Sequence, residues 1–184
     1  MASTNLKMSR VKCFLFDADV IIAAHEAHAW DSLVTSCDLY VSSIVIREVK
    51  YFKDHGVKRA IDLSAQVRSG AIVELAATAE EMDEFLGQFD LMLKDMLHQG
   101  EIEGLTLMKL DKAPDDCFYC TGDGTACRTL GLIGAGDRAI SLQEACAAAG
   151  VMKPLASNFE KDYMRSRVQL GQRERIQGLG FDKS

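Results

Sequence analysis

Short apolar runs alternate with helical segments along most of the chain, and this alternation limits its possible folds more than any other feature. The apolar runs have the length of strands and are Val11–Phe16, Asp38–Val41, Ala71–Leu75, Cys117–Cys120 and Ala139–Ser141. Strands separated by helices predict a parallel sheet, because each parallel connection needs a long crossover. We therefore expect an α/β fold with a doubly wound, mostly parallel sheet of about five strands and helices on both faces, in three layers.

The segments between these runs have helical periodicity and helix-capping signals. The expected helices are Ala23–Cys37, Ser43–Phe52, Val57–Ser69, Glu80–His98 with a break near Gly87–Asp90, Glu101–Leu110, Thr125–Leu132 and Leu142–Ala149. Three pairs have the spacing of a capping box: Thr78 with Glu81, Ser141 with Glu144, and Ser157 with Glu160.

The length of 184 residues suits one domain. We expect an α/β domain over residues 1–155 and a helical, basic tail over residues 156–184 that packs on this domain or extends from it. The six cysteines are scattered, which favours reduced, buried thiols. The polar start, Met1–Arg10, lacks an apolar signal segment, and no apolar run reaches the length of a membrane span. These features predict a cytoplasmic protein without a membrane partner.

Acidic residues follow two of the most apolar strands. Asp17 comes directly after Val11–Phe16, with Asp19 two residues later, and Asp123 follows Cys117–Cys120. Ligands of such sheets bind beyond the carboxyl ends of the strands. If the two strands are neighbours, the carboxylates of Asp17 and Asp123 converge there.

Further acidic residues lie in the helices that follow the second expected strand and precede the fourth. Glu48 lies in the helix after the second strand, and Glu101 and Glu103 open the helix before the fourth. Carboxylates gathered in one place repel one another unless a cation lies among them, and ligands that are all oxygen favour Mg²⁺ or Mn²⁺. The alternative is structural: Asp123 is placed to cap a helix, and Glu101 and Glu103 suit a first helical turn.

Four motifs in this order resemble those of the PIN-domain family of ribonucleases, which includes VapC-like toxins. They are FDADVII (16–22), SSIVIREV (42–49), GEIEGLTLM (100–108) and TGDGTACRTLG (121–131). The resemblance covers residues 11 to 150 and implies a doubly wound, Rossmann-like fold that cleaves single-stranded RNA with Mg²⁺ or Mn²⁺. The third acid is a glutamate where aspartate is commoner in the family.

Matched position by position, the resemblance implies catalytic and metal-binding roles for Asp17, Glu48, Glu103 and Asp123, with Glu101 competing with Glu103. Thr121, Asp19 and Glu101 would support the site. The family also implies RNA as partner and, for its toxins, an antitoxin; a homodimer is a further expectation.

Two other functions are compatible with the same residues. A haloacid-dehalogenase-like phosphatase would use Asp17 as nucleophile and Asp19 as acid and base, with Ser42, Lys109 or Lys112, and Asp123 completing the site. Cys127 stands where its metal loop normally has another acid. A non-catalytic binding module with the same fold is the second alternative.

The formal net charge of −6 weighs against nucleic-acid binding, but the charge is uneven. Residues 74–103 hold nine acidic residues and one lysine, whereas residues 157–184 hold six Lys or Arg and four Asp or Glu. Arg128, one helical turn beyond Asp123, is a candidate phosphate contact or a partner for a carboxylate. The basic cluster of the tail is a second candidate RNA contact; its residues are Lys161, Arg165, Arg167, Arg173 and Arg175.

Overall fold

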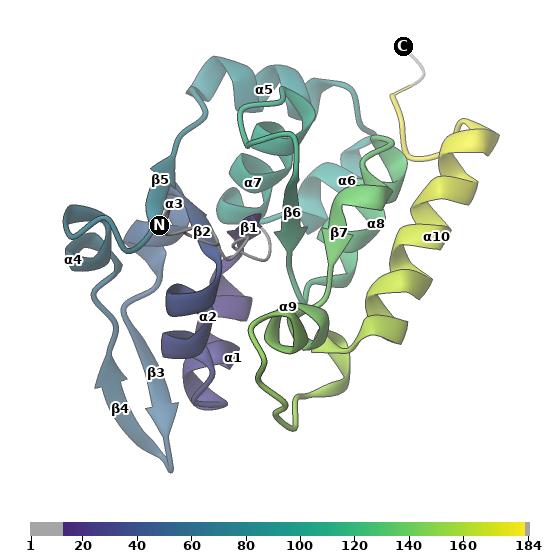
Figure 1. Ribbon diagram of the computed structural model, residues 1–184. Coiled ribbons are helices and arrows are strands. Elements are labelled where there is room, and N and C mark those ends of the chain that lie inside the picture. Colours follow the sequence, from purple (N-terminus) through teal and green to yellow (C-terminus); the bar gives the residue numbers. More distant parts are fainter. Residues whose placement is uncertain (1–12, 183–184) are drawn as a thin grey trace, which may run out of the picture.

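A computed structural model describes residues 13–182, and its centre is a five-stranded parallel sheet (Figure 1). The strands are β1 (Cys13–Phe16), β2 (Asp38–Ser42), β5 (Val73–Leu75), β6 (Cys117–Cys120) and β7 (Ala139–Ile140). They are ordered β5-β2-β1-β6-β7. The α/β fold and the five expected strands are confirmed. Met1–Arg10, whose polar character bears on targeting, lies outside the described residues.

Helices cover both faces of the sheet. They are α1 (Ala18–Glu26), α2 (Trp30–Ser36), α3 (Ser43–Glu48), α4 (Leu63–Arg68), α5 (Ala79–Gly87), α6 (Leu91–Met96), α7 (Gln99–Lys109), α8 (Gly124–Leu132), α9 (Leu142–Ala148) and α10 (Lys161–Gln177), with 3-10 turns at Gly136–Arg138 and Ser157–Phe159. The expected break near Gly87–Asp90 is confirmed, because α5 and α6 are separate helices.

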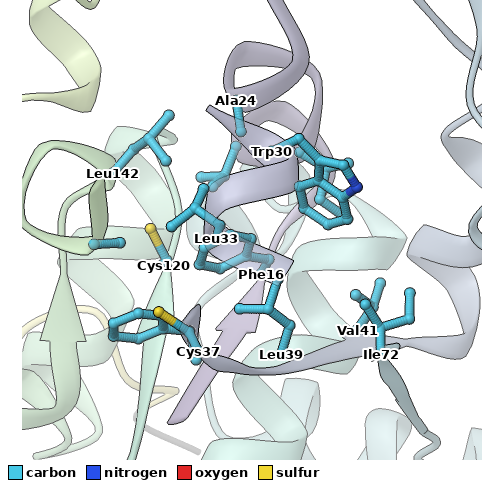
Figure 2. Close-up of a cluster of buried hydrophobic side chains, with 14 of the residues drawn as sticks. Phe16, Ala24, Trp30, Leu33, Cys37, Leu39, Val41, Ile72, Cys120 and Leu142 are labelled. Carbon is cyan, nitrogen blue, oxygen red and sulfur yellow. The ribbon is translucent and has the colours of Figure 1, made fainter. Parts of the chain in front are cut away.

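Alternate residues of β1 enter two different cores. Phe14 and Phe16 pack with α1, α2 and α9, and Figure 2 shows Phe16 among the buried side chains of this core. Cys13 and Leu15 pack with α5, α6, α7 and α8 on the opposite face. This alternation follows from the two-residue period of a strand, and it explains why β1 is apolar throughout. All six cysteines are buried and free.

The region after α3 differs from the sequence expectation. Instead of a helix through Phe52 and another from Val57, the chain forms an antiparallel hairpin of β3 (Tyr51–Asp54) and β4 (Val57–Ala60). His55 and Gly56 form its turn with φ of 48° and 83°, as the right-handed twist of a two-residue hairpin requires. Exposed and half-buried side chains alternate along β3, whereas β4 is exposed throughout. The helical prediction for these residues was wrong because His55–Gly56 is not one of the usual turn pairs of a hairpin.

The C-terminal helix α10 lies along the outer side of α8 (Figure 1). The two backbones approach closely: a Cβ atom at Gly171 would overlap the carbonyl oxygen of Arg128, and one at Gly131 would overlap that of Val168. The capping boxes at Thr78 and Ser141 are confirmed. The one expected at Ser157 is wrong, because that serine begins a 3-10 turn and α10 starts after Glu160.

The order of the strands places a crossover between β1 and β6. From β1 the chain moves outward to β2 and β5, and it then returns to β6 and β7 on the other side of β1. Such a switch point leaves a crevice at the carboxyl ends of the two central strands. Within residues 13–182, no helix has both the length and the apolar character that crossing a membrane requires.

Candidate metal centre

An acidic pocket opens at this switch point. Its volume is about 310 Å³, and its lining residues are Asp17, Ala18, Asp19, Glu48, His98, Gly100, Glu101 and Asp123. They come from four segments: the start of α1, the end of α3, the start of α7 and the turn between β6 and α8. Among residues 13–182, no lysine or arginine lines this pocket. Five carboxyl groups therefore share it without a cationic Lys or Arg side chain.

Asp17 lies at the bottom of the acidic pocket, and only 4% of it is exposed. It caps α1: its Oδ1 accepts a hydrogen bond from the backbone N of Ala18 (2.7 Å), and its Oδ2 accepts one from the hydroxyl of Thr121 (2.8 Å). Burial raises the pKa of Asp17, and the charges of Asp123 and Glu48 raise it further, against the lowering effect of the two hydrogen bonds. A cation beside Asp17 would remove this repulsion.

Asp123 caps α8 on the neighbouring strand. Its Oδ1 accepts hydrogen bonds from the backbone N of Thr125 (2.7 Å) and of Ala126 (2.9 Å). Its own backbone N donates to the Thr121 hydroxyl oxygen at 3.1 Å. The same hydroxyl donates to Asp17, so Thr121 links the two aspartates and holds them in register. The capping role that the sequence indicated for Asp123 is confirmed, and the residue also lines the acidic pocket.

Asp19 lies in the first turn of α1, directed toward the β6–α8 turn. Its Oδ2 accepts a hydrogen bond from the backbone N of Gly122 at 3.0 Å. Its Oδ1 is buried and has no hydrogen-bond partner among the described residues. Burial, followed by the charge of Asp17, raises the pKa of Asp19 well above its ordinary value. Asp19 thus holds the Gly122 turn in place through this hydrogen bond.

The start of α7 brings Glu101 to the acidic pocket beside Glu48. A Cβ atom at Gly100 would lie 3.1 Å from Glu48 Oε2 and 3.9 Å from Asp17 Oδ1, so a glycine there permits a close approach. Glu101 closes a capping box: its Oε2 accepts from the backbone N of His98 at 3.0 Å, and its Oε1 lies 3.2 Å from His98 Nδ1.

The protonation of Glu101 is tied to its acidic neighbours. Burial raises its pKa to about 7, and the charges of Asp123 and Asp17 also raise it. The hydrogen bond with Glu101 raises the pKa of His98. His98 and Gly100 were not among the site residues expected from the sequence; the His-x-x-Glu spacing at the start of α7 is the signal that points to this segment.

Glu103 lies outside the acidic pocket, contrary to the sequence expectation. It is 1% exposed, and its carboxylate accepts hydrogen bonds from the Ser43 hydroxyl (2.8 Å), the backbone N of Ile44 (2.7 Å) and the backbone N of Ala77 (3.3 Å). These contacts satisfy the start of α3 and fix it to α7. Glu101, the alternative candidate for the third acid of the site, lines the acidic pocket instead.

Arg128 also lies outside the acidic pocket. Its Nε pairs with the Glu174 carboxylate on α10, which was the alternative that the sequence left open. In the tail, Lys161 Nζ pairs with Glu144 Oε1 at 2.8 Å. The tail cations lie on α10, which packs along α8, and Arg167 Nε would lie 3.4 Å from a Cβ atom at Gly124, the residue after Asp123.

The additional residues of a phosphatase site are not gathered here. Ser42 is buried and caps α3, and Lys112 Nζ pairs with the Glu81 carboxylate. Lys109 is eight residues after Glu101 on α7, about 12 Å further along the helix axis at 1.5 Å per residue. Neither lysine lines the acidic pocket, so within residues 13–182 no ammonium group lines it beside Asp17, as this mechanism needs.

A second group of possible metal ligands lies at the tip of the β3–β4 hairpin. One ligand atom from each of His28, Asp54 and His55 lies within 4.8 Å of the others. Both histidines are exposed, and Arg59 Nε lies 3.6 Å from Asp54 Oδ2, so the carboxylate already has a cationic neighbour. The acidic pocket is therefore the stronger candidate for a metal centre.

No family model matches the chain, and neither a curated protein nor a solved structure matches it.

Proposed function

We propose that this protein is a Mg²⁺- or Mn²⁺-dependent ribonuclease that hydrolyses phosphodiester bonds in single-stranded RNA. The observation that carries the proposal is the acidic pocket itself: five carboxyl groups from four segments, with no Lys or Arg among its lining residues in the described part of the chain. The resemblance of the four sequence motifs to PIN-domain ribonucleases supports the RNA substrate.

The side chains of the acidic pocket fit a hard divalent cation. They offer carboxylate oxygens and, at the rim, one imidazole, and oxygen-rich sites favour Mg²⁺ and Mn²⁺ over softer metals. The pKa values of Asp17 and Glu101 are raised because both carboxylates are buried and lie near other acidic groups. The buried Oδ1 of Asp19 has no hydrogen-bond partner within residues 13–182, a further sign that the described residues do not fully satisfy the polar groups of this site.

The protein positions the proposed ligands before any ion binds. Thr121 and the start of α1 hold Asp17, and the first turn of α8 holds Asp123. Glu48 is exposed at the mouth of the acidic pocket, where it can complete the ligand set or accept a proton from an attacking water. A divalent ion held by these residues supplies charge stabilisation to the phosphodiester and a lowered pKa to water.

Cleavage of a labelled single-stranded RNA with Mn²⁺, Mg²⁺ or EDTA tests the proposal. We expect cleavage with either metal and none with EDTA. Asp17→Asn and Asp123→Asn should each lower the cleavage rate about 100-fold or more, because substituting a residue that only holds a metal ligand in place already lowers metal affinity or activity about 10- to 100-fold. Glu84→Gln, at an exposed position on α5, is the matched control.

Three results would contradict the proposal. Equal cleavage by Asp17→Asn and the parent would remove the acidic pocket from the reaction. Phosphate or fluoroberyllate trapped on Asp17 would indicate a phosphatase. The absence of Mn²⁺ binding at millimolar metal would favour a non-catalytic module.

A further inference from the structure

The β3–β4 hairpin is separate from the central sheet and follows directly after α3. It packs beside α1 and projects past the carboxyl ends of β1 and β6 (Figure 1). Glu48, the last residue of α3, lines the acidic pocket, and β3 begins three residues later. The hairpin is therefore tied by the backbone to one wall of the proposed active site.

The inner face of the hairpin is fixed to the domain. The ring of Phe52 stacks on His25 with centroids 5.1 Å apart, and His25 stacks in turn on the buried Trp30 at 4.9 Å. Side chains alternate between the two faces of a strand, so Tyr51 and Lys53 leave the face opposite Phe52. Their cross-strand partners are Ala60 and Lys58.

The outer face presents an aromatic ring between cations. Tyr51 is 45% exposed, and Lys58 Nζ lies 4.1 Å from the centroid of its ring. Lys53 and Lys58 are directly opposite each other and both are exposed. Like charges in this position destabilise an antiparallel pair. An anion bound across the two lysines would reverse that penalty.

The charge of the hairpin is opposite to that of the whole chain. Residues 50–60 contain four Lys or Arg and one Asp, a formal charge of +3, in a chain whose net charge is −6. The four cations are Lys50, Lys53, Lys58 and Arg59. A polyanion approaching this largely acidic protein would meet a favourable field here.

A groove joins the hairpin to the acidic pocket. It has a volume of about 330 Å³, and its lining residues are Ile22, Glu26, Glu48, Lys50, Tyr51, Phe52 and Lys53. Glu48 lines this groove and the acidic pocket alike. A strand of nucleic acid lying on the outer face of the hairpin would thus have a continuous route to the carboxylates.

We infer that the outer face of the β3–β4 hairpin binds single-stranded RNA, with Lys53 and Lys58 on consecutive phosphates and Tyr51 stacked on a base, and leads it to the acidic pocket. The inference rests on the proposed function and adds its substrate-binding surface. An exposed aromatic ring among lysines is the arrangement that binds unpaired bases, whereas a duplex hides its base faces.

Fluorescence anisotropy with labelled oligouridylate in EDTA measures this binding without cleavage. We expect Lys53→Gln with Lys58→Gln to weaken binding and to lower the slope of log K against log salt by about 1.4, or roughly 0.7 for each cation on a single strand. Tyr51→Ala should weaken binding about 10-fold, and Tyr51→Phe should restore it. Lys109→Gln with Lys153→Gln, two exposed lysines away from the hairpin, is the matched control and should bind as the parent does.

The outcomes separate the two proposals. Unchanged affinity and salt slope in the Lys53 and Lys58 variant, with its circular dichroism intact, would overturn the hairpin inference even if the parent cleaves RNA. Equally tight binding of an acidic peptide, insensitive to Tyr51→Ala, would overturn it in favour of a protein partner. Hairpin-dependent RNA binding would uphold it even if Mn²⁺ failed to support cleavage, a result that would count against the nuclease alone.

Discussion

Glu101 and Glu103 lie two residues apart on α7, yet their carboxylates serve different parts of the molecule. Glu101 lines the acidic pocket with Asp17 and Asp123, whereas Glu103 binds the first turn of α3. An α-helix turns about 100° per residue, so side chains two positions apart leave nearly opposite sides. This separation makes distinct predictions for the two glutamates.

Glu101→Gln should stabilise the metal-free protein at pH 8. Folding disfavours the charged form of Glu101, because the pKa of this residue rises from its ordinary 4.5 to about 7 in the folded protein. Each pKa unit of this difference lowers the unfolding free energy by about 1.4 kcal/mol when Glu101 is charged. The variant should therefore gain up to about 3 kcal/mol of unfolding free energy at pH 8, and the gain should shrink as the pH falls from 7 toward 4.5, where the parent also binds the proton. Urea denaturation at several pH values measures it, with Glu84→Gln as control. A gain that is the same at every pH would contradict the buried-charge explanation.

Mn²⁺ binding should weaken as the pH falls below about 7. The ion must displace protons from the carboxyl groups whose pKa values are raised, which include Glu101 and Asp17. Titration calorimetry at pH 8 and pH 6 should show tighter binding at pH 8 and proton release on binding. Thermal unfolding should shift upward with Mn²⁺ by mass action, more so at pH 8. Affinity that is independent of pH would place the ion elsewhere.

Glu103→Ala should destabilise the fold while leaving the metal site in place. The substitution removes the acceptor of three hydrogen bonds and leaves the half-buried donors at Ser43, Ile44 and Ala77 without this partner. A loss of about 3 kcal/mol in unfolding free energy is expected, since hydrogen bonds to a charged group contribute about 1.5 to 3 kcal/mol. The protein that remains folded should bind Mn²⁺ as the parent does. The reverse pattern, with stability kept and affinity lost, would make Glu103 a ligand after all.

Gly171→Ala should separate α10 from α8. A methyl group there would overlap the Arg128 carbonyl oxygen, which is a backbone atom and cannot rotate away as a side chain can, so the two helices must move apart. We expect a loss of about 1 to 3 kcal/mol, as for overpacked cores, measured by thermal or urea unfolding. Gly87→Ala is the control, because a Cβ atom at Gly87 meets nothing within 4 Å. Equal stability of the two variants would show that the C-terminal helix contributes little to the folded domain.

Much of the fold could be read from local patterns. The strands of the sheet, the break between α5 and α6 and the caps at Thr78 and Ser141 depend on residues close together in the chain. The convergence of Asp17 and Asp123 also followed, because each ends a strongly apolar strand and such strands occupy the middle of a parallel sheet. The hairpin at residues 51–60 was missed because its turn, His55–Gly56, lacks the usual Asn-Gly or Asp-Gly signal and its strands are short and mostly polar.

The sequence by itself determined the class of fold, the sheet edge where acids gather and the identity of its two central aspartates, since strand period and strand ends are local properties. Only the tertiary structure decided that Glu101 rather than Glu103 faces the acidic pocket, that Arg128 pairs with Glu174, and that residues 51–60 form a basic hairpin whose groove shares Glu48 with the pocket. These outcomes depend on the rotational phase of a helix against its neighbours and on contacts between segments far apart in the chain, which no local pattern records.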